Sequence, residues 1–277
     1  MKILKHAVAA LTGLGMLAAA SSSLAIPTLS YTTTNYGAFS HDPFDGFDWN
    51  SAGSAVTSGF VPDGTTVFTT EFWSDAVTIK RLGGGTFASA LTAAGTANGA
   101  EFTIQAFINE TAVPLTATTS AFTAVGGSYN IWYQPLSNAN LVTGAGITDG
   151  TLVLSGSILP GFAGTFTALP VGGGTGIFTF LGNVTSTNAA FINPDLIDTE
   201  AVSTIQFGSS TTSWTQPTST PSGAIGPGDL IFQADANQSF TAAVPYPMTT
   251  TSSISKASGC MTTSKVVSPL TGSFWVE

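Results

Sequence analysis

Cysteine, histidine and positively charged residues are scarce in this chain. Its 277 residues include one Cys, two His and six Lys or Arg, against 15 Asp or Glu, and the formal net charge is −9. A single cysteine, Cys260, cannot form an intramolecular disulfide, so the fold has to be held by its core and by strand pairing. So few cations exclude the Lys/Arg-rich surface with which proteins bind phosphate backbones, and we expect no nucleic-acid partner.

The sequence also lacks the common catalytic and zinc-binding patterns. No serine has a glycine two residues away on both sides, which is the pattern of a nucleophile elbow. His41 is the only histidine after residue 25, and it lies in a turn-like stretch. One histidine and one cysteine far apart do not form a familiar zinc ligand set. We therefore expect a protein that is not an enzyme and has no catalytic residues.

The first 25 residues have the three parts of a secretory signal peptide. Lys2 and Lys5 form a cationic start, residues 7–20 are mostly apolar, and small residues precede Ala25. This pattern predicts cleavage after Ala25 and a secreted or cell-surface protein. The apolar stretch is too short to cross a hydrocarbon core of about 30 Å comfortably, so we expect no transmembrane span in the mature chain.

Alternating apolar and polar residues predict an all-β fold. The clearest strand is residues 101–108, in which Phe102, Ile104, Ala106 and Ile108 fall on one face. This pattern is typical of a half-buried antiparallel strand. Similar runs occupy residues 67–73, 76–82, 129–134, 151–158, 164–169, 177–184, 202–207 and 230–234, with turn dipeptides at residues 63–64, 98–99 and 149–150. We predict a large antiparallel β-sandwich, jelly-roll-like, with ten or more strands and little helix.

The composition divides the chain into three parts. Residues 1–25 are the predicted signal peptide, and residues 26–243 are predicted to form a single sandwich domain. Within it, residues 211–228 are a Ser/Thr/Pro-rich loop that we expect to be irregular. Residues 244–277 form a separate C-terminal segment.

Three stretches resemble a known family. They are residues 131–157 (IWYQPLSNANLVTGAGITDGTLVLSGS), 191–197 (FINPDLI) and 230–240 (LIFQADANQSF). They resemble the flocculation-associated PEP-CTERM proteins, exported all-β proteins of exopolysaccharide-producing Gram-negative bacteria that are linked to aggregation of cells into flocs. The resemblance implies a role in the extracellular matrix.

The C-terminal segment departs from that family. Its members end in Val-Pro-Glu-Pro, an apolar span and an arginine cluster, which a sorting enzyme reads. Here residues 244–247 read VPYP, and neither an apolar span nor terminal arginines follow. Either the protein is released unanchored or this segment attaches by another route.

An acidic stretch near the start of the mature chain is a candidate calcium site. Asp42, Asp45, Asp48 and Asn50 lie within nine residues, and Ca²⁺ prefers six to eight oxygen ligands. The alternative is a surface turn. Residues 235–237 are a second oxygen-rich stretch, and calcium binding is favoured if the two stretches meet in space.

Aromatic and acidic residues suggest contacts with carbohydrate. Trp132 and Trp214 are candidate platforms for stacking on sugar rings, as is Tyr129, although packing in the core is the alternative for each. Paired carboxylates would be needed for glycoside hydrolysis, and the glutamates available are Glu71, Glu101, Glu110 and Glu200. Glu101 is explained as the outward residue of a strand, and Glu110 lies beside an expected turn.

These observations favour a non-enzymatic structural or adhesive protein of the extracellular matrix, which contributes to cell aggregation or to floc and biofilm formation. Its expected partners are extracellular polysaccharide or further copies of itself. Two alternatives remain open. One is a carbohydrate-binding or polysaccharide-active module, and the other is a subunit of a surface filament in which residues 26–35 add to a neighbour's sheet edge.

Overall fold

The computed structural model describes residues 28–33, 37–40, 44–81, 86–87, 99–168, 174–208 and 214–241, which form strands and loops without a helix. The predicted all-β fold is confirmed. The strands are β1 (Thr28–Thr33), β2 (Gly37–Ser40), β3 (Phe44–Trp49), β4 (Ser54–Ser58), β5 (Phe68–Arg81), β6 (Thr86–Phe87), β7 (Glu101–Pro114), β8 (Thr119–Gln134), β9 (Thr151–Ile158), β10 (Ala163–Ala168), β11 (Gly174–Thr187), β12 (Ile192–Asn193), β13 (Glu200–Phe207), β14 (Ser219–Thr220), β15 (Gly223–Ala224) and β16 (Leu230–Thr241). The predicted signal peptide, Cys260 and the C-terminal segment lie outside the described residues.

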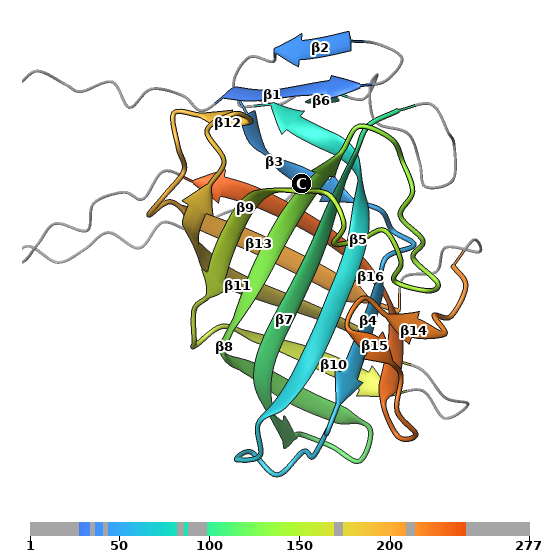
Figure 1. Cartoon of the computed structure of the whole chain (residues 1–277). Coiled ribbons are helices and arrows are strands. Elements are labelled where there is room, and N and C mark those ends of the chain that lie inside the picture. Colours follow the sequence, from blue (N-terminus) through green and yellow to red (C-terminus); the bar gives the residue numbers. More distant parts are fainter. Residues whose placement is uncertain are drawn as a thin grey trace, which may run out of the picture. The chain divides into compact units, whose positions relative to one another are not determined.

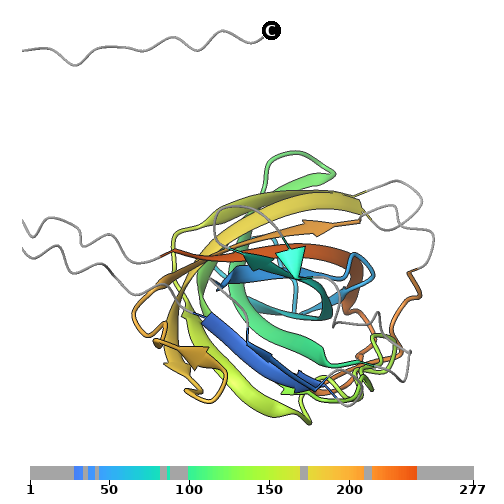
Figure 2. The same ribbon diagram turned by 90° about the horizontal axis from the view of Figure 1, so that it is seen from above.

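Eleven of the strands form one antiparallel sheet that closes on itself (Figures 1 and 2). Around the sheet the order is β5, β7, β8, then β9 with β10, then β11, β13 and β16, and finally β3 with β4, which pair with β5 again. β9 and β10 lie end to end between β8 and β11. Most neighbouring strands are close along the chain, and the pairing of β16 with β3 and β4 joins the two ends of the sheet. Two walls of one antiparallel sheet face each other across a core, as in the predicted sandwich. The walls are joined along one side by β9 and β10 and along the other by β3 and β4.

Aromatic side chains fill the interior of the closed sheet. Phe47 and Trp49 on β3 stack with ring centroids 5.0 Å apart, and Phe47 lies 5.3 Å from Phe102 on β7. Phe102 in turn lies 5.2 Å from Tyr133 on β8. Burial of each such side chain contributes about 1.5–3 kcal/mol, so this cluster is a major source of folding free energy.

The alternation predicted for residues 101–108 is confirmed on the inner face of β7. Phe102, Ile104, Ala106 and Ile108 are all buried. The prediction that this strand is only half-buried is wrong, because Glu101, Thr103 and Gln105 on the outer face are buried as well. Two long loops cover them, one following β8 and the other preceding β16.

These covering loops create a second apolar cluster outside the closed sheet. Val56 and Trp73 point outward from β4 and β5 and pack against Ala139 and Ile147 of the loop after β8. The indole Nε1 of Trp73 donates a hydrogen bond to the carbonyl oxygen of Leu141 over 3.0 Å. Residues distant in sequence therefore bury this part of the sheet on both faces.

One end of the interior is covered by a small sheet. β1 pairs with β2 and with β12, and Leu29 of β1 and Ile192 of β12 are fully buried. Phe191, next to β12, lies 5.0 Å from Tyr133 near the last residue of β8. Residues 28–33 of the segment suggested above for strand exchange are thus paired within their own chain in this structure.

Several finer predictions need correction. The separate strands predicted at residues 67–73 and 76–82 are replaced by one continuous strand, β5 (Phe68–Arg81). The loop predicted at residues 211–228 contains the β14–β15 hairpin. The turn at residues 63–64 is confirmed: Asp63 Oδ1 accepts hydrogen bonds from the amides of Thr65 and Thr66, and Gly64 has a φ of 79°. No helix in the described residues is long and apolar enough to span a membrane.

Candidate functional site: an aromatic cavity with one buried carboxyl

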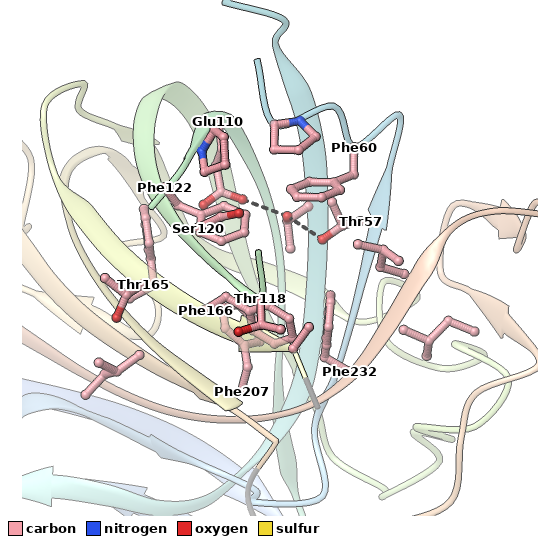
Figure 3. Close-up of a pocket in the computed structure, with 18 of the residues that line it drawn as sticks. Thr57, Phe60, Glu110, Thr118, Ser120, Phe122, Thr165, Phe166, Phe207 and Phe232 are labelled. Atoms are coloured by element: carbon pink, nitrogen blue, oxygen red, sulfur yellow. Dashed lines mark hydrogen bonds between the residues drawn. The ribbon is translucent and has the colours of Figure 1, made fainter. Parts of the chain in front are cut away.

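A cavity of about 580 Å³ opens at the end of the closed sheet opposite to β1 and β12. It is lined by the last residues of β4, β7 and β13 and by the first residues of β5, β8, β11 and β16, together with β10. Figure 3 shows five of the phenylalanines that face the space: Phe60, Phe122, Phe166, Phe207 and Phe232. Phe178 of β11 lines it as well. The wall is therefore mainly aromatic.

These rings contact one another around the cavity. Phe60 and Phe122 stack with centroids 5.8 Å apart, and Phe166 lies edge-on to Phe232 at 4.9 Å. Phe207 lies 5.6 Å from Phe232. Rings that pack against neighbours lose little further conformational entropy when a ligand binds, so this part of the wall is preorganised.

Glu110 is the buried charged group of this wall. It is 3% exposed and lies on β7, and Thr70 on the neighbouring strand β5 donates a hydrogen bond from Oγ1 to its Oε2 over 2.7 Å. The hydroxyls of Thr70 and Thr57, on β4, are 2.8 Å apart. When Glu110 is a carboxylate, the single proton of the Thr70 hydroxyl points to Glu110, and Thr57 is then the donor to Thr70. Figure 3 shows this chain of hydrogen bonds.

Burial changes the acidity of Glu110. Removal from water raises the pKa of this carboxyl from 4.5 to about 7, and the hydrogen bond from Thr70 opposes the shift only partly. The group therefore changes between its acid and its carboxylate form near neutral pH. It can donate a hydrogen bond in the first form and pair with a positive charge in the second.

The position of Glu110 follows from the alternation in β7. Residues 102, 104, 106 and 108 point inward, and a side chain two positions further along the same strand points inward again. The prediction of a strand that ends at residue 108, with Glu110 beside a turn, is wrong because β7 continues to Pro114. Counting the same alternation for one more step would have found this residue.

The other glutamates do not form a catalytic pair with Glu110. Glu71 points to the outer face of β5, where its Oε1 accepts hydrogen bonds from Gln105 Nε2 at 2.7 Å and from Ser222 Oγ at 2.9 Å. Glu101 holds the loop after β8 by accepting hydrogen bonds from the amides of Asn138 and Ala139. Both residues fasten covering loops to the sheet. Glu200 begins β13 and does not line the cavity.

The two oxygen-rich stretches considered for calcium do meet. Asp48 on β3 is paired in register with Asn237 on β16. Burial raises the pKa of Asp235, and the negative charge of Asp48 raises it further. Lys80 lies in the same region, where burial lowers its pKa and the charges of Asp48 and Asp45 oppose that change.

The remaining calcium candidates add little to this picture. Asn50 Oδ1 accepts a hydrogen bond from the Ala52 amide over 2.9 Å, and Asp42 lies outside the described residues. Within the described part of the chain, no three His, Cys, Asp or Glu residues are grouped as a metal site. Calcium binding stays a prediction.

The tryptophans suggested for sugar stacking are half-buried. Trp132 lies on the outer face of β8, whereas its neighbours Ile131 and Tyr133 point into the core. Trp214 donates a hydrogen bond from Nε1 to Ser54 Oγ over 3.1 Å. Tyr129 is 1% exposed, so it is a core residue and the suggestion of a platform there is wrong.

Comparison with protein-family models, with curated proteins and with solved structures finds no match for this chain. The family resemblance therefore stays a prediction.

Proposed function

We propose that this protein binds a small, largely apolar molecule inside the closed sheet. The observation that carries the proposal is the cavity of about 580 Å³ with phenylalanine walls and one buried carboxyl, Glu110. Binding sites for small molecules are usually concave and mainly apolar, with volumes of about 300–1,000 Å³ and a few polar groups that orient the ligand. The cavity has each of these properties.

The polar groups at the cavity are placed to orient such a ligand. Glu110 lies on the β5–β7 side of the wall, and Thr118 and Ser120 lie where β8 begins. The apolar rings supply most of the contact area, and each square ångström of apolar surface removed from water contributes about 25 cal/mol. A molecule with an apolar body and one polar end matches this arrangement of apolar rings and a few polar groups.

A fluorescent probe tests the proposal. N-phenyl-1-naphthylamine is neutral and apolar, and its emission rises when it leaves water. We expect the full-length protein to bind it, and Ser120→Trp, which fills the cavity, to weaken binding by about 10-fold or more. Thr119→Trp is the matched control, because Thr119 precedes Ser120 on β8 and is paired with Thr167 by a hydroxyl contact of 3.1 Å instead of lining the cavity. Equal binding by the two variants would contradict the proposal.

A role in cell aggregation is our second candidate, and it concerns the outer surface. Pairs of uncharged polar side chains link neighbouring strands there: Thr69 with Asn109 at 3.0 Å and Thr179 with Thr204 at 3.2 Å. Such surfaces offer hydroxyl and amide groups to polysaccharide, which favours an exported, non-enzymatic matrix protein that contacts polysaccharide or other copies of itself. We expect a strain without the gene to form flocs that settle more slowly, with recovery on complementation; unchanged settling would end this candidate.

A further inference from the structure

The lining of the cavity is biased toward negative charge. Its charged residues are Glu110, which is buried, and Asp229, which is half-buried and accepts a hydrogen bond from the Gly226 amide. Among the described residues, no Lys, Arg or His lines the cavity. The whole chain also has a net charge of −9. An anionic ligand such as a fatty acid would therefore enter without a positive partner and against the field of the protein.

The aromatic wall favours the opposite charge. The face of a phenyl ring has a negative electrostatic potential, and it attracts a cation within about 6 Å of its centroid, most strongly away from water. Six phenylalanines line the cavity. Several rings can therefore contact one cationic group at the same time.

Glu110 has no positive partner within the described part of the chain. Thr70 donates a hydrogen bond to Glu110. Burial and this hydrogen bond cause the shift in the pKa of Glu110, and no neighbouring charge among the described residues contributes to it. A buried carboxylate without a counter-ion is costly, and one that pairs with a cation in a dry site is strongly stabilised. When Glu110 is ionised, the cavity thus contains a buried carboxylate without a counter-ion from the described residues.

We propose that the ligand of this cavity is an organic cation, with its apolar body against the phenylalanines and its positively charged centre beside Glu110. This inference rests on the proposed function, because it specifies the ligand class of the same cavity. An amine or a quaternary ammonium compound has the required chemistry.

Two compounds of the same shape test the inference. Phenyltrimethylammonium and tert-butylbenzene differ in one central atom and in charge. Their affinities are measured by displacement of N-phenyl-1-naphthylamine at pH 8 from the wild-type protein and from Glu110→Gln. We expect the ratio of the two affinities, cation over neutral compound, to fall by about 10-fold or more in Glu110→Gln, because the amide cannot pair with the cation. Glu110→Asp, which retains the charge, should retain the preference, and Glu200→Gln outside the cavity should leave it unchanged.

The outcomes separate the two proposals. If both compounds bind and their affinity ratio is the same in the wild type and in Glu110→Gln, the inference about charge is overturned and the proposed function stands. If neither the compounds nor the naphthylamine bind to the wild type, both are overturned. Binding of the naphthylamine by each variant serves as the check that its cavity has formed.

Discussion

Thr70 on β5 donates a hydrogen bond to Glu110 on β7 over 2.7 Å, at the point where the interior of the sheet changes from a packed aromatic core to a cavity. On one side of this pair lie buried side chains such as Ile108 and Phe72, and on the other lies the open space of the cavity. A carboxyl at such a boundary is removed from water without a counter-ion. Its ionisation is therefore coupled both to folding and to ligand binding.

The first prediction concerns the dependence of folding stability on pH. The pKa of Glu110 is 4.5 before folding and about 7 in the folded protein, so the folded state favours the protonated form. The stabilisation is fully present below pH 4.5 and is lost as the pH rises through about 7. We expect the free energy of unfolding of the wild type, relative to Glu110→Gln, to fall by about 3 kcal/mol between pH 4 and pH 8.

Urea denaturation at several pH values measures this difference. Comparing the two proteins cancels the contributions of other titrating groups to the pH dependence. Glu101 is one of these groups, because burial raises its pKa as well. A constant difference across this pH range would show that Glu110 ionises as it does in water.

The second prediction concerns the dependence of ligand binding on pH. Only the carboxylate form of Glu110 pairs with a cation, so the affinity for a permanently charged ligand rises with pH until Glu110 is ionised. With a pKa of about 7, Glu110 is almost wholly protonated at pH 5, so binding of phenyltrimethylammonium there should be about 10-fold or more weaker than at pH 8, as in Glu110→Gln. Thr57 and Thr70, which adjoin Glu110, do not titrate in this range, and the other acidic residue of the lining is Asp229. Isothermal titration should show this change in the wild type and a flat profile in Glu110→Gln; a flat wild-type profile would count against pairing.

The third prediction concerns the loop that Glu101 holds. Its carboxylate accepts hydrogen bonds from the amides of Asn138 and Ala139 at 2.8 and 3.0 Å and from Ser137 Oγ at 3.0 Å. Replacing Glu101 with Ala leaves these donors without their acceptor and should cost about 1–3 kcal/mol. We expect hydrogen exchange at Asn138 and Ala139 to accelerate, while the affinity for N-phenyl-1-naphthylamine stays unchanged. Unaltered exchange at both amides would mean that other contacts hold the loop.

The fourth prediction concerns the aromatic core. Phe102 is fully buried between Phe47 and Tyr133, so Phe102→Ala should lower the free energy of unfolding by about 3–5 kcal/mol. Leu152→Ala is the control, because Leu152 is 42% exposed and its truncation should change stability by less than about 0.5 kcal/mol. Thermal denaturation compares the two, and equal losses would contradict the assignment of Phe102 to the core.

The sequence predicted the strands whose alternation is regular and missed what depends on long-range contact. Residues 151–158 were predicted as a strand and form β9 with the same bounds. The first half of β8 was missed, because Gly126 and Gly127 interrupt its pattern with φ values near 147°. The burial of Trp73 could not be predicted either, since the loop that covers it is 68 residues further along the chain.

The candidate site was harder to predict than the fold. A glutamate in an apolar pattern normally indicates the end of a buried strand, so Glu110 marked a boundary in the sequence analysis. Only the closure of the sheet brings Phe60, Phe166 and Phe232 around it, and residues from separate strands leave no local pattern. The position of Glu110 on the inner face was therefore the one signal available.

The most direct test of the central claim locates a bound ligand. Crystals of the protein grown with 2-bromonaphthalene, an apolar molecule that fits a cavity of about 580 Å³, would give an anomalous signal from bromine. We predict a bromine peak among Phe122, Phe166 and Phe232, and its loss in Ser120→Trp. A peak only on the outer surface, or no peak in the wild type, would contradict the claim that this closed sheet is built to hold a small molecule.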